Sequence, residues 1–141
     1  MSATVRQVIE AVGGSLTASG LSPVYLRRLS AVDGQEGVVV RPGTLSAQAE
    51  YIDGSADVSM PVRVIVKRRD SALAMAQAED AAGLLGMTAL TAGGSEVTFA
   101  AAADRARELE LSGSGWYVWE ADLTASWHID GRGVLRDEAD S

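Results

Sequence analysis

The sequence predicts an α+β fold, with an antiparallel or mixed β-sheet of four or more strands and two α-helices packed on one face of it. Two segments space their apolar residues as one face of a helix does, and several others alternate apolar and polar residues. The expected order is helix, hairpin, strand, helix and a closing β-meander. That order is typical of a sheet that is not purely parallel.

The composition is that of one ordinary globular domain. The chain has 141 residues, of which 47% are hydrophobic and 22% charged, and it contains no cysteine. A chain of this length can bury a core without metal or disulfide support. We therefore expect a single domain over residues 1–130, followed by a flexible acidic tail over residues 131–141.

The first helix is predicted to begin after a cap at Ser2 or Thr4. Its apolar face consists of residues spaced three or four apart, namely Val5, Val8, Ile9, Val12 and Leu16. Gly13 and Gly14 weaken the far end of this helix. Two short strands, 24–29 and 38–41, are then expected to form a hairpin through the turn residues Asp33 and Gly34.

The middle of the chain predicts a long polar loop, a strand and a second helix. Residues 43–57 are rich in small polar side chains, and loops of this length are often functional. Residues 60–67 alternate as a strand does. A helix is expected from a cap at Asp70 or Ser71 to about Leu85, with these core contacts: Leu73, Ala76, Ala81, Leu84 and Leu85.

The last third predicts a β-meander that ends in a long half-buried strand. Residues 97–101 and 108–111 alternate, and residues 117–129 form the longest alternation in the chain. Its odd-numbered residues form the apolar face, and its even-numbered residues, from Glu120 to His128, form the wet face. Seven residues along the chain are expected in the core: Val8, Val12, Val62, Val64, Leu84, Trp119 and Leu123.

The charge balance excludes two classes of partner. The net charge is −7 and the sequence pI is about 4.6, whereas affinity for nucleic acid and for anionic membranes depends on lysine and arginine. No apolar run approaches the roughly 20 residues that span a bilayer. Residues 1–6 lack the pattern of a signal peptide, so we expect synthesis and folding in a cytoplasm.

Catalytic and metal-binding patterns fail one by one. His128 is the only histidine, and we interpret it as a solvated strand residue without a catalytic partner. The stretch 53–57 resembles the start of a calcium loop, but Val58 and Val64 occupy the positions that need glycine and glutamate. The basic cluster Lys67–Arg69 is interpreted as a solvated strand end. We expect no catalytic residue, no metal site and no cofactor.

Three short stretches carry a resemblance to a known family. They are Glu50–Gly54, Lys67–Ser71 at the start of an Ala/Leu-rich helix, and Gly115–Ala121 in the last strand. With the order of elements from Val5 to Ile129, they resemble the tail terminator or minor capsid proteins of tailed bacteriophages. The resemblance implies a structural protein without cofactor or catalytic residue.

The resemblance also implies a place and a set of partners. Copies would form a homo-oligomeric ring, usually a hexamer, that caps the tail tube, ends its growth and presents a surface to the head. The partners would be the tail tube protein and the head–tail connector protein, with DNA only passing through and no membrane. The location would be the head-proximal end of the virion tail, after assembly in the host cytoplasm.

Two alternatives stay open at this point. One is another head–tail joining protein, such as a stopper or neck component, which would share the size and acidity of this chain. The other is a small α+β ligand-binding or enzymatic domain, against which the lack of convergent polar groups counts.

Two sets of residues are candidates for function. An interface is expected at Tyr51, Ile52, Asp53 and Gly54 in the long loop, because a tight turn would present apolar side chains there. Trp116 is a further interface candidate, or a strand-end residue covered by a loop. Acidic residues expected on wet strand faces could line a channel through the ring: Glu108, Glu110, Glu120 and Asp122.

Overall fold

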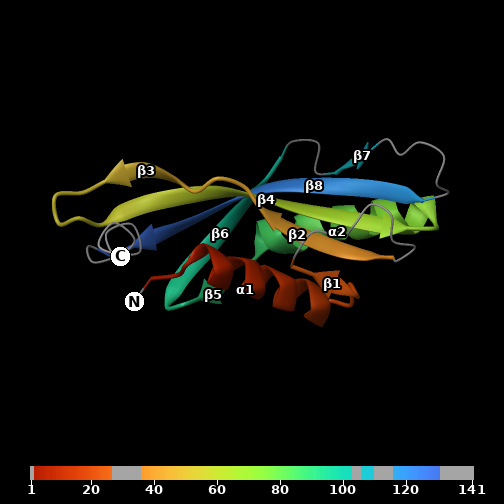
Figure 1. Cartoon of the computed structure of the whole chain (residues 1–141), viewed down its shortest axis with the longest axis horizontal. Coiled ribbons are helices and arrows are strands. Elements are labelled where there is room, and N and C mark those ends of the chain that lie inside the picture. Colours follow the sequence, from red (N-terminus) through yellow and green to blue (C-terminus); the bar gives the residue numbers. More distant parts are fainter. Residues whose placement is uncertain (1, 27–35, 103–105, 110–115, 131–141) are drawn as a thin grey trace.

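Two thirteen-residue strands, β4 (Ala56–Arg68) and β8 (Tyr117–Ile129), pair antiparallel along their whole length and form the centre of the sheet (Figure 1). The structure is a computed structural model and describes residues 2–26, 36–102, 106–109 and 116–130. Within those ranges, no helix has the length and apolar character needed to cross a bilayer.

Shorter strands cover both outer edges of this central pair, two along each edge. The partners of β4 are β2 (Gly37–Pro42) and β3 (Ser46–Glu50), and those of β8 are β6 (Ser95–Ala101) and β7 (Arg107–Leu109), all antiparallel. At the two ends of the sheet, β5 (Leu90–Ala92) pairs antiparallel with β6, and β1 (Val24–Tyr25) pairs parallel with β2. The described strands therefore form one mixed sheet of eight, as the predicted fold class requires.

Both helices begin at predicted caps. The Thr4 hydroxyl accepts the amide of Gln7, whose side chain in turn accepts the Thr4 amide, so α1 (Val5–Ala18) begins with a capping box. Asp70 accepts the Leu73 amide at the start of α2 (Ser71–Met87). Gly13 does not end α1. It leaves room for Leu26, since a Cβ there would lie 2.7 Å from that side chain.

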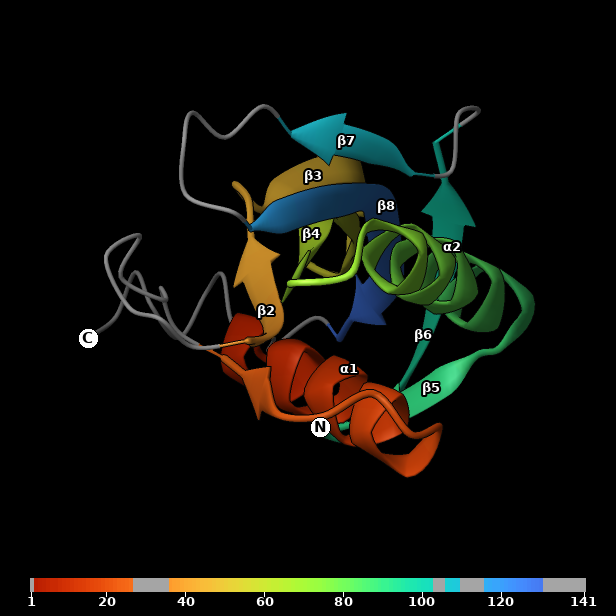
Figure 2. The ribbon, with the colours of Figure 1, turned by 90° about the vertical axis from the view of Figure 1, so that its right-hand side faces the viewer.

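The core lies between the helices and one face of the sheet. Alternate β4 residues from Ala56 to Val66 are buried, and both helices contribute to the same apolar cluster. Figure 2 shows that α1 and α2 lie on the side of β8 away from β7. Of the seven predicted core residues, five are buried, namely Val8, Val12, Val62, Val64 and Leu123, while Leu84 and Trp119 are partly buried against them.

The predicted hairpin between residues 24 and 41 is wrong. In the described part of this segment, β1 spans only Val24–Tyr25 and runs parallel to β2, with the Val38 amide donating to the Pro23 carbonyl at 2.9 Å. The expected turn at residues 33 and 34 lies outside the described residues. Alternation indicates a strand but does not reveal the direction in which it pairs.

The long loop predicted over residues 43–57 is also wrong. Most of it forms β3 and the start of β4, so only a short turn joins the two strands. The prediction missed β3 because its side chains are exposed on both faces of the sheet edge, which removes the apolar alternation. The pairing of β3 shifts register between Ala47 and Ala49, as at a β-bulge.

The second helix buries the predicted contacts Ala81 and Leu85, and Leu84 in part, but the other two predicted contacts are wrong. Leu73 is 44% exposed and Ala76 is exposed, whereas Ala74, Ala78, Ala81, Ala82 and Leu85 are buried. This helix is apolar on nearly all sides, so its periodicity could not select a face. Strand β5, which follows this helix, was likewise not predicted.

The alternation in β4 predicts which substitutions unfold the protein. Val64→Asp places an unpaired carboxylate against both neighbouring strands, and we expect a loss of about 4 kcal/mol or more in the free energy of unfolding. Chemical denaturation monitored by circular dichroism measures it. The control is Thr124→Asp on the exposed face of β8, which should change stability by no more than about 0.5 kcal/mol. If both variants lost the same free energy of unfolding, the assignment of Val64 to the buried face and Thr124 to the exposed face would be contradicted.

Candidate assembly interface

A tight turn joins β3 to β4 and forms the hairpin tip, defined here as residues 51–54. The Gly54 amide donates to the Tyr51 carbonyl and the Tyr51 amide donates to the Ser55 carbonyl, both at 2.9 Å. Gly54 has φ of 86°, a conformation that favours glycine. Asp53 Oδ1 accepts the Ser55 amide at 2.9 Å and the Ser55 hydroxyl at 2.6 Å, which closes the turn.

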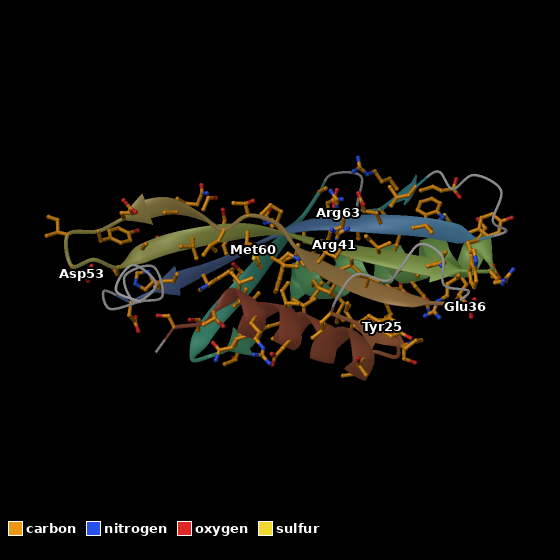
Figure 3. The ribbon with its side chains drawn as sticks, viewed as in Figure 1. Tyr25, Glu36, Arg41, Asp53, Met60 and Arg63 are labelled. Carbon is orange, nitrogen blue, oxygen red and sulfur yellow. The ribbon has the colours of Figure 1, made fainter. Side chains whose placement is uncertain are left out.

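The tip presents an apolar side chain to solvent. Ile52 is 108% exposed and Tyr51 is 48% exposed. The tip lies at one end of the long axis of the molecule, and Asp53 marks it in Figure 3 (Figures 1 and 3). The structure thus brings together four of the predicted interface residues, on a hairpin instead of the expected loop.

A chain of hydrogen-bonded side chains on the outer face of the sheet connects Tyr51 at the tip to Asp57 on β4 and His128 on β8. The Tyr51 hydroxyl donates to Asp57 Oδ2 at 2.5 Å, and His128 Nδ1 lies 2.8 Å from Asp57 Oδ1. The Tyr51 hydroxyl, and then His128, hold the pKa of Asp57 below its usual value, and the same hydrogen bond raises the pKa of Tyr51. His128 is solvent-exposed as predicted, and its hydrogen-bond partner Asp57 was not foreseen from the sequence.

The turn also fixes the charge at the tip. The hydroxyl and then the amide of Ser55 hold the pKa of Asp53 below its ordinary value, so this carboxyl is ionised at neutral pH. Its Oδ1 accepts both of these hydrogen bonds. Oδ2 accepts none from the residues that the structure describes, so it is able to meet a cation.

The four predicted lumen acids do not share one environment. Glu120 is 2% exposed, so its expected place on a wet face is wrong: β7 covers that part of the strand, and Arg107 Nη2 lies 2.7 Å from Glu120 Oε1. Asp122 is half-buried and Glu108 is exposed. Glu110 lies outside the described residues.

Two arginines balance the acids of β8. Arg63 Nε lies 3.2 Å from both Glu120 Oε2 and Asp122 Oδ1, and Arg107 Nη2 lies 3.5 Å from Asp122 Oδ2. A buried carboxylate is tolerated where charged donors satisfy it in this way. These contacts place two of the expected lumen acids inside an ion-pair network.

Only Arg69 of the basic cluster is exposed at the strand end as its sequence indicated, and the prediction is wrong for Lys67 and Arg68. Lys67 and Arg68 are 9% and 6% exposed, and Arg68 donates to Gln77 and to the Ser22 carbonyl. The Lys67 amine and the Arg69 guanidinium lie 4.7 and 4.1 Å from the ring centroid of Trp116. Trp116 is half-buried, and both cations lie close enough to its ring for cation–π contacts.

A groove of about 530 Å³ crosses the outer face near the middle of the central strands. Two rows of paired residues form much of it. In one row Arg41, Arg63 and Asp122 lie on adjacent strands, and in the next row Pro61 and Thr124 lie beside Ala100. Figure 3 shows Arg41 and Arg63 beside each other.

This groove was missed at the level of sequence because it depends on strand register. Alternation places Arg63 and Asp122 on outer faces, but it does not show that they are direct partners. The same applies to Asp57 and His128. Across the described part of the chain, no three His, Asp or Glu side chains are grouped as metal ligands would be.

Comparison with known proteins identifies the family. A chain from the virion of a native gene transfer agent particle has the same fold, with a TM-score of 0.68 over 91% of this chain and 99% of that chain, at 16% sequence identity. No curated protein matches the sequence. The family model described as bacteriophage tail terminator protein matches residues 17–129, which include the hairpin tip, the groove and the central strands. The chain therefore belongs to the bacteriophage tail terminator family and is a structural protein of the phage tail and head-joining region.

Proposed function

We propose that copies of this protein form a closed ring, a hexamer, that caps the completed tail tube, ends its growth and presents a surface to the head–tail connector. Family membership supports this proposal over a ligand-binding or enzymatic domain. It also favours a terminator over a stopper or neck component. The ring assembles in the host cytoplasm and occupies the head-proximal end of the tail.

The observation that carries the proposal is the hairpin tip. An isoleucine that is 108% exposed at the end of a protruding hairpin gains free energy only by contact with another molecule. A closed ring of identical copies needs two different surfaces that meet head to tail. A protruding tip supplies one of these surfaces, and the other lies elsewhere on the same chain.

The polar chain from Tyr51 to His128 prepares the tip for binding. A hairpin already held in one conformation loses less conformational entropy when it docks. The turn bonds around Asp53 and the contacts of Asp57 supply this order before any partner arrives. We propose Trp116 as a secondary contact, because its side chain is only half-buried in the folded chain.

We also propose that the channel of the ring is electronegative, so that DNA passes without binding. The net charge of −7 supports this. Of the predicted lumen acids in the described ranges, Glu108 is the exposed contributor on β7, whereas Arg63 and Arg107 offset Glu120 and Asp122. Glu110 remains a proposed contributor from sequence alone.

The proposed tip contact is tested by replacing Tyr51 and Ile52 together with serine. We expect tails of abnormal length, or tails without heads, in electron micrographs of phage carrying this variant, because the apolar anchor is gone. Ile52→Ser alone should reproduce the defect without affecting the hydrogen bond of Tyr51 to Asp57. The purified subunit should stay folded by circular dichroism.

The matched control is Met87→Ser, which removes another highly exposed apolar side chain, 86% exposed, at the end of α2. It should leave tails normal. Normal tails carrying normal heads in both tip variants would contradict the proposal.

The hydrogen bond that orders the hairpin predicts how the stability of the protein depends on pH. Because the pKa of Asp57 is lower in the folded chain, its contribution to stability is present above the unfolded pKa of about 3.9 and is lost as the pH falls through the folded value. Tyr51→Phe removes the main donor, so the pKa of Asp57 should rise toward its ordinary value in an NMR titration. Asp53, held by Ser55, should titrate unchanged. An unchanged Asp57 would show that the Tyr51 hydroxyl does not bind it.

The electronegative channel is tested by Glu108→Lys in the assembled protein. DNA retention at low salt should increase and should fall as salt is added, because lysines in the channel would release phosphate counterions. Glu79→Lys on α2 changes the net charge equally at another exposed position and should retain less DNA. Equal retention by the two variants would rule out Glu108 as a lumen residue.

A further inference from the structure

The groove on the outer face lies between the two places where the edge strands change, residues 60–61 on β4 and residues 121–122 on β8. These places are not directly opposite each other, since residues 121–122 pair with Val64 and Arg63. On one side β2 ends at Pro42 before β3 begins, and on the other β6 ends at Ala101 before β7 begins. Pro61 and Ala100 give the groove apolar surface, and the Gly43 amide donates to the Pro61 carbonyl at 2.7 Å. The outer face is therefore open at this place and partly apolar.

The groove also carries an excess of positive charge. Arg41 and Arg63 are direct cross-strand partners, an arrangement that is unfavourable for like charges without a nearby anion. Glu120 and Asp122 balance Arg63 and Arg107. Among the residues that the structure describes, none forms an ion pair with Arg41, so a carboxylate from outside would complete the row.

The hairpin tip has the complementary chemistry. It joins a fully exposed isoleucine to an ionised aspartate whose Oδ2 is able to accept from a guanidinium. Glu50, also exposed, adds a second negative charge beside it. An apolar side chain next to a carboxylate matches a groove in which apolar surface lies next to an arginine.

A tip cannot reach the groove of its own chain. Pro61 lies five residues along β4 from Ala56, which is about 17 Å of extended strand at about 3.4 Å per residue. Full-length pairing with β8 keeps this strand straight enough to hold the two places apart. The tip and the groove are thus two different surfaces on each copy, as a head-to-tail ring requires.

We propose that the hairpin tip of one copy binds in the groove of the neighbouring copy, with Ile52 against Pro61 and Ala100 and with the Asp53 carboxylate on the Arg41 guanidinium. This inference rests on the proposed function and adds the receiving surface. A contact of the tip with the tail tube protein instead is an outcome that the experiment separates.

The absence of native cysteine makes disulfide trapping a direct test. Ile52→Cys and Thr124→Cys, on the tip and in the groove, are purified separately, mixed and oxidised. A disulfide needs Cα atoms within about 7 Å, so the tip and the groove of one chain cannot form one. We expect a one-to-one disulfide dimer, and a chain carrying both cysteines should give a series of oligomers that ends at the size of the ring.

The control pairs Ile52→Cys with Ala76→Cys, an exposed position on α2, and should trap little dimer. The ion pair is tested in the trapping background by Arg41→Gln and Asp53→Asn, the second of which keeps an oxygen for Ser55. Each should slow trapping about tenfold, and the double variant should be no slower than either single one. Arg6→Gln on α1 serves as the charge control and should have no effect.

The outcomes separate this inference from the function it rests on. Normal tails with Ile52→Ser would remove the role of the tip, and with it the groove contact. Abnormal tails with Ile52→Ser, together with equal trapping at Thr124 and Ala76, would overturn the groove contact alone and would assign the tip to the tail tube protein. Circular dichroism of each cysteine variant confirms that the fold is retained.

Discussion

The full-length antiparallel pairing of β4 with β8 is the constraint on which the other features depend. Thirteen consecutive residue pairs fix which side chains point to the helices and which point away. On the inner face this gives a continuous apolar surface that α1 and α2 cover together. On the outer face it aligns Asp57 with His128 and Arg63 with Asp122, so a one-residue slip would destroy both the core and the polar contacts.

The outer face of the sheet differs from one end to the other because different short strands pair with the central strands at different places. Near Glu120, the pairing of β7 removes a carboxylate from solvent and supplies Arg107 to it. Near Pro61, β2 has ended and β3 has not yet begun on the β4 edge, and the groove remains open. At the far end, β3 extends the sheet into the protruding hairpin. Along the central pair of strands, the ion pairs around Glu120, the groove and the hairpin tip thus follow one another in this order.

Sequence periodicity predicted the elements that are buried on one side only. Thr4 and Asp70 as caps, the inward face of β4 and most of β8 are confirmed. The errors fall where periodicity carries no signal. Strand β3 is exposed on both faces, and α2 is apolar on nearly every side, so Leu73 and Ala76 could not be distinguished from the alanines that are buried.

The sequence predicted only those parts of the candidate site that are formed by residues close together in the chain. The turn at residues 51–54 follows from its own residues, and the structure retains it. The burial of Glu120, the anchoring of Tyr51 by Asp57 and the pairing of Arg41 with Arg63 join residues far apart in the chain. Such contacts depend on strand order and register, which a single sequence does not specify.

The register shift in β3 has a consequence for how this protein avoids uncontrolled self-association. An exposed sheet edge is a template onto which another chain can add a strand. The edge formed by β3 is only five residues long, polar, and interrupted between Ala47 and Ala49. Such an edge resists the addition of strands from other chains, even though the hairpin that carries it protrudes.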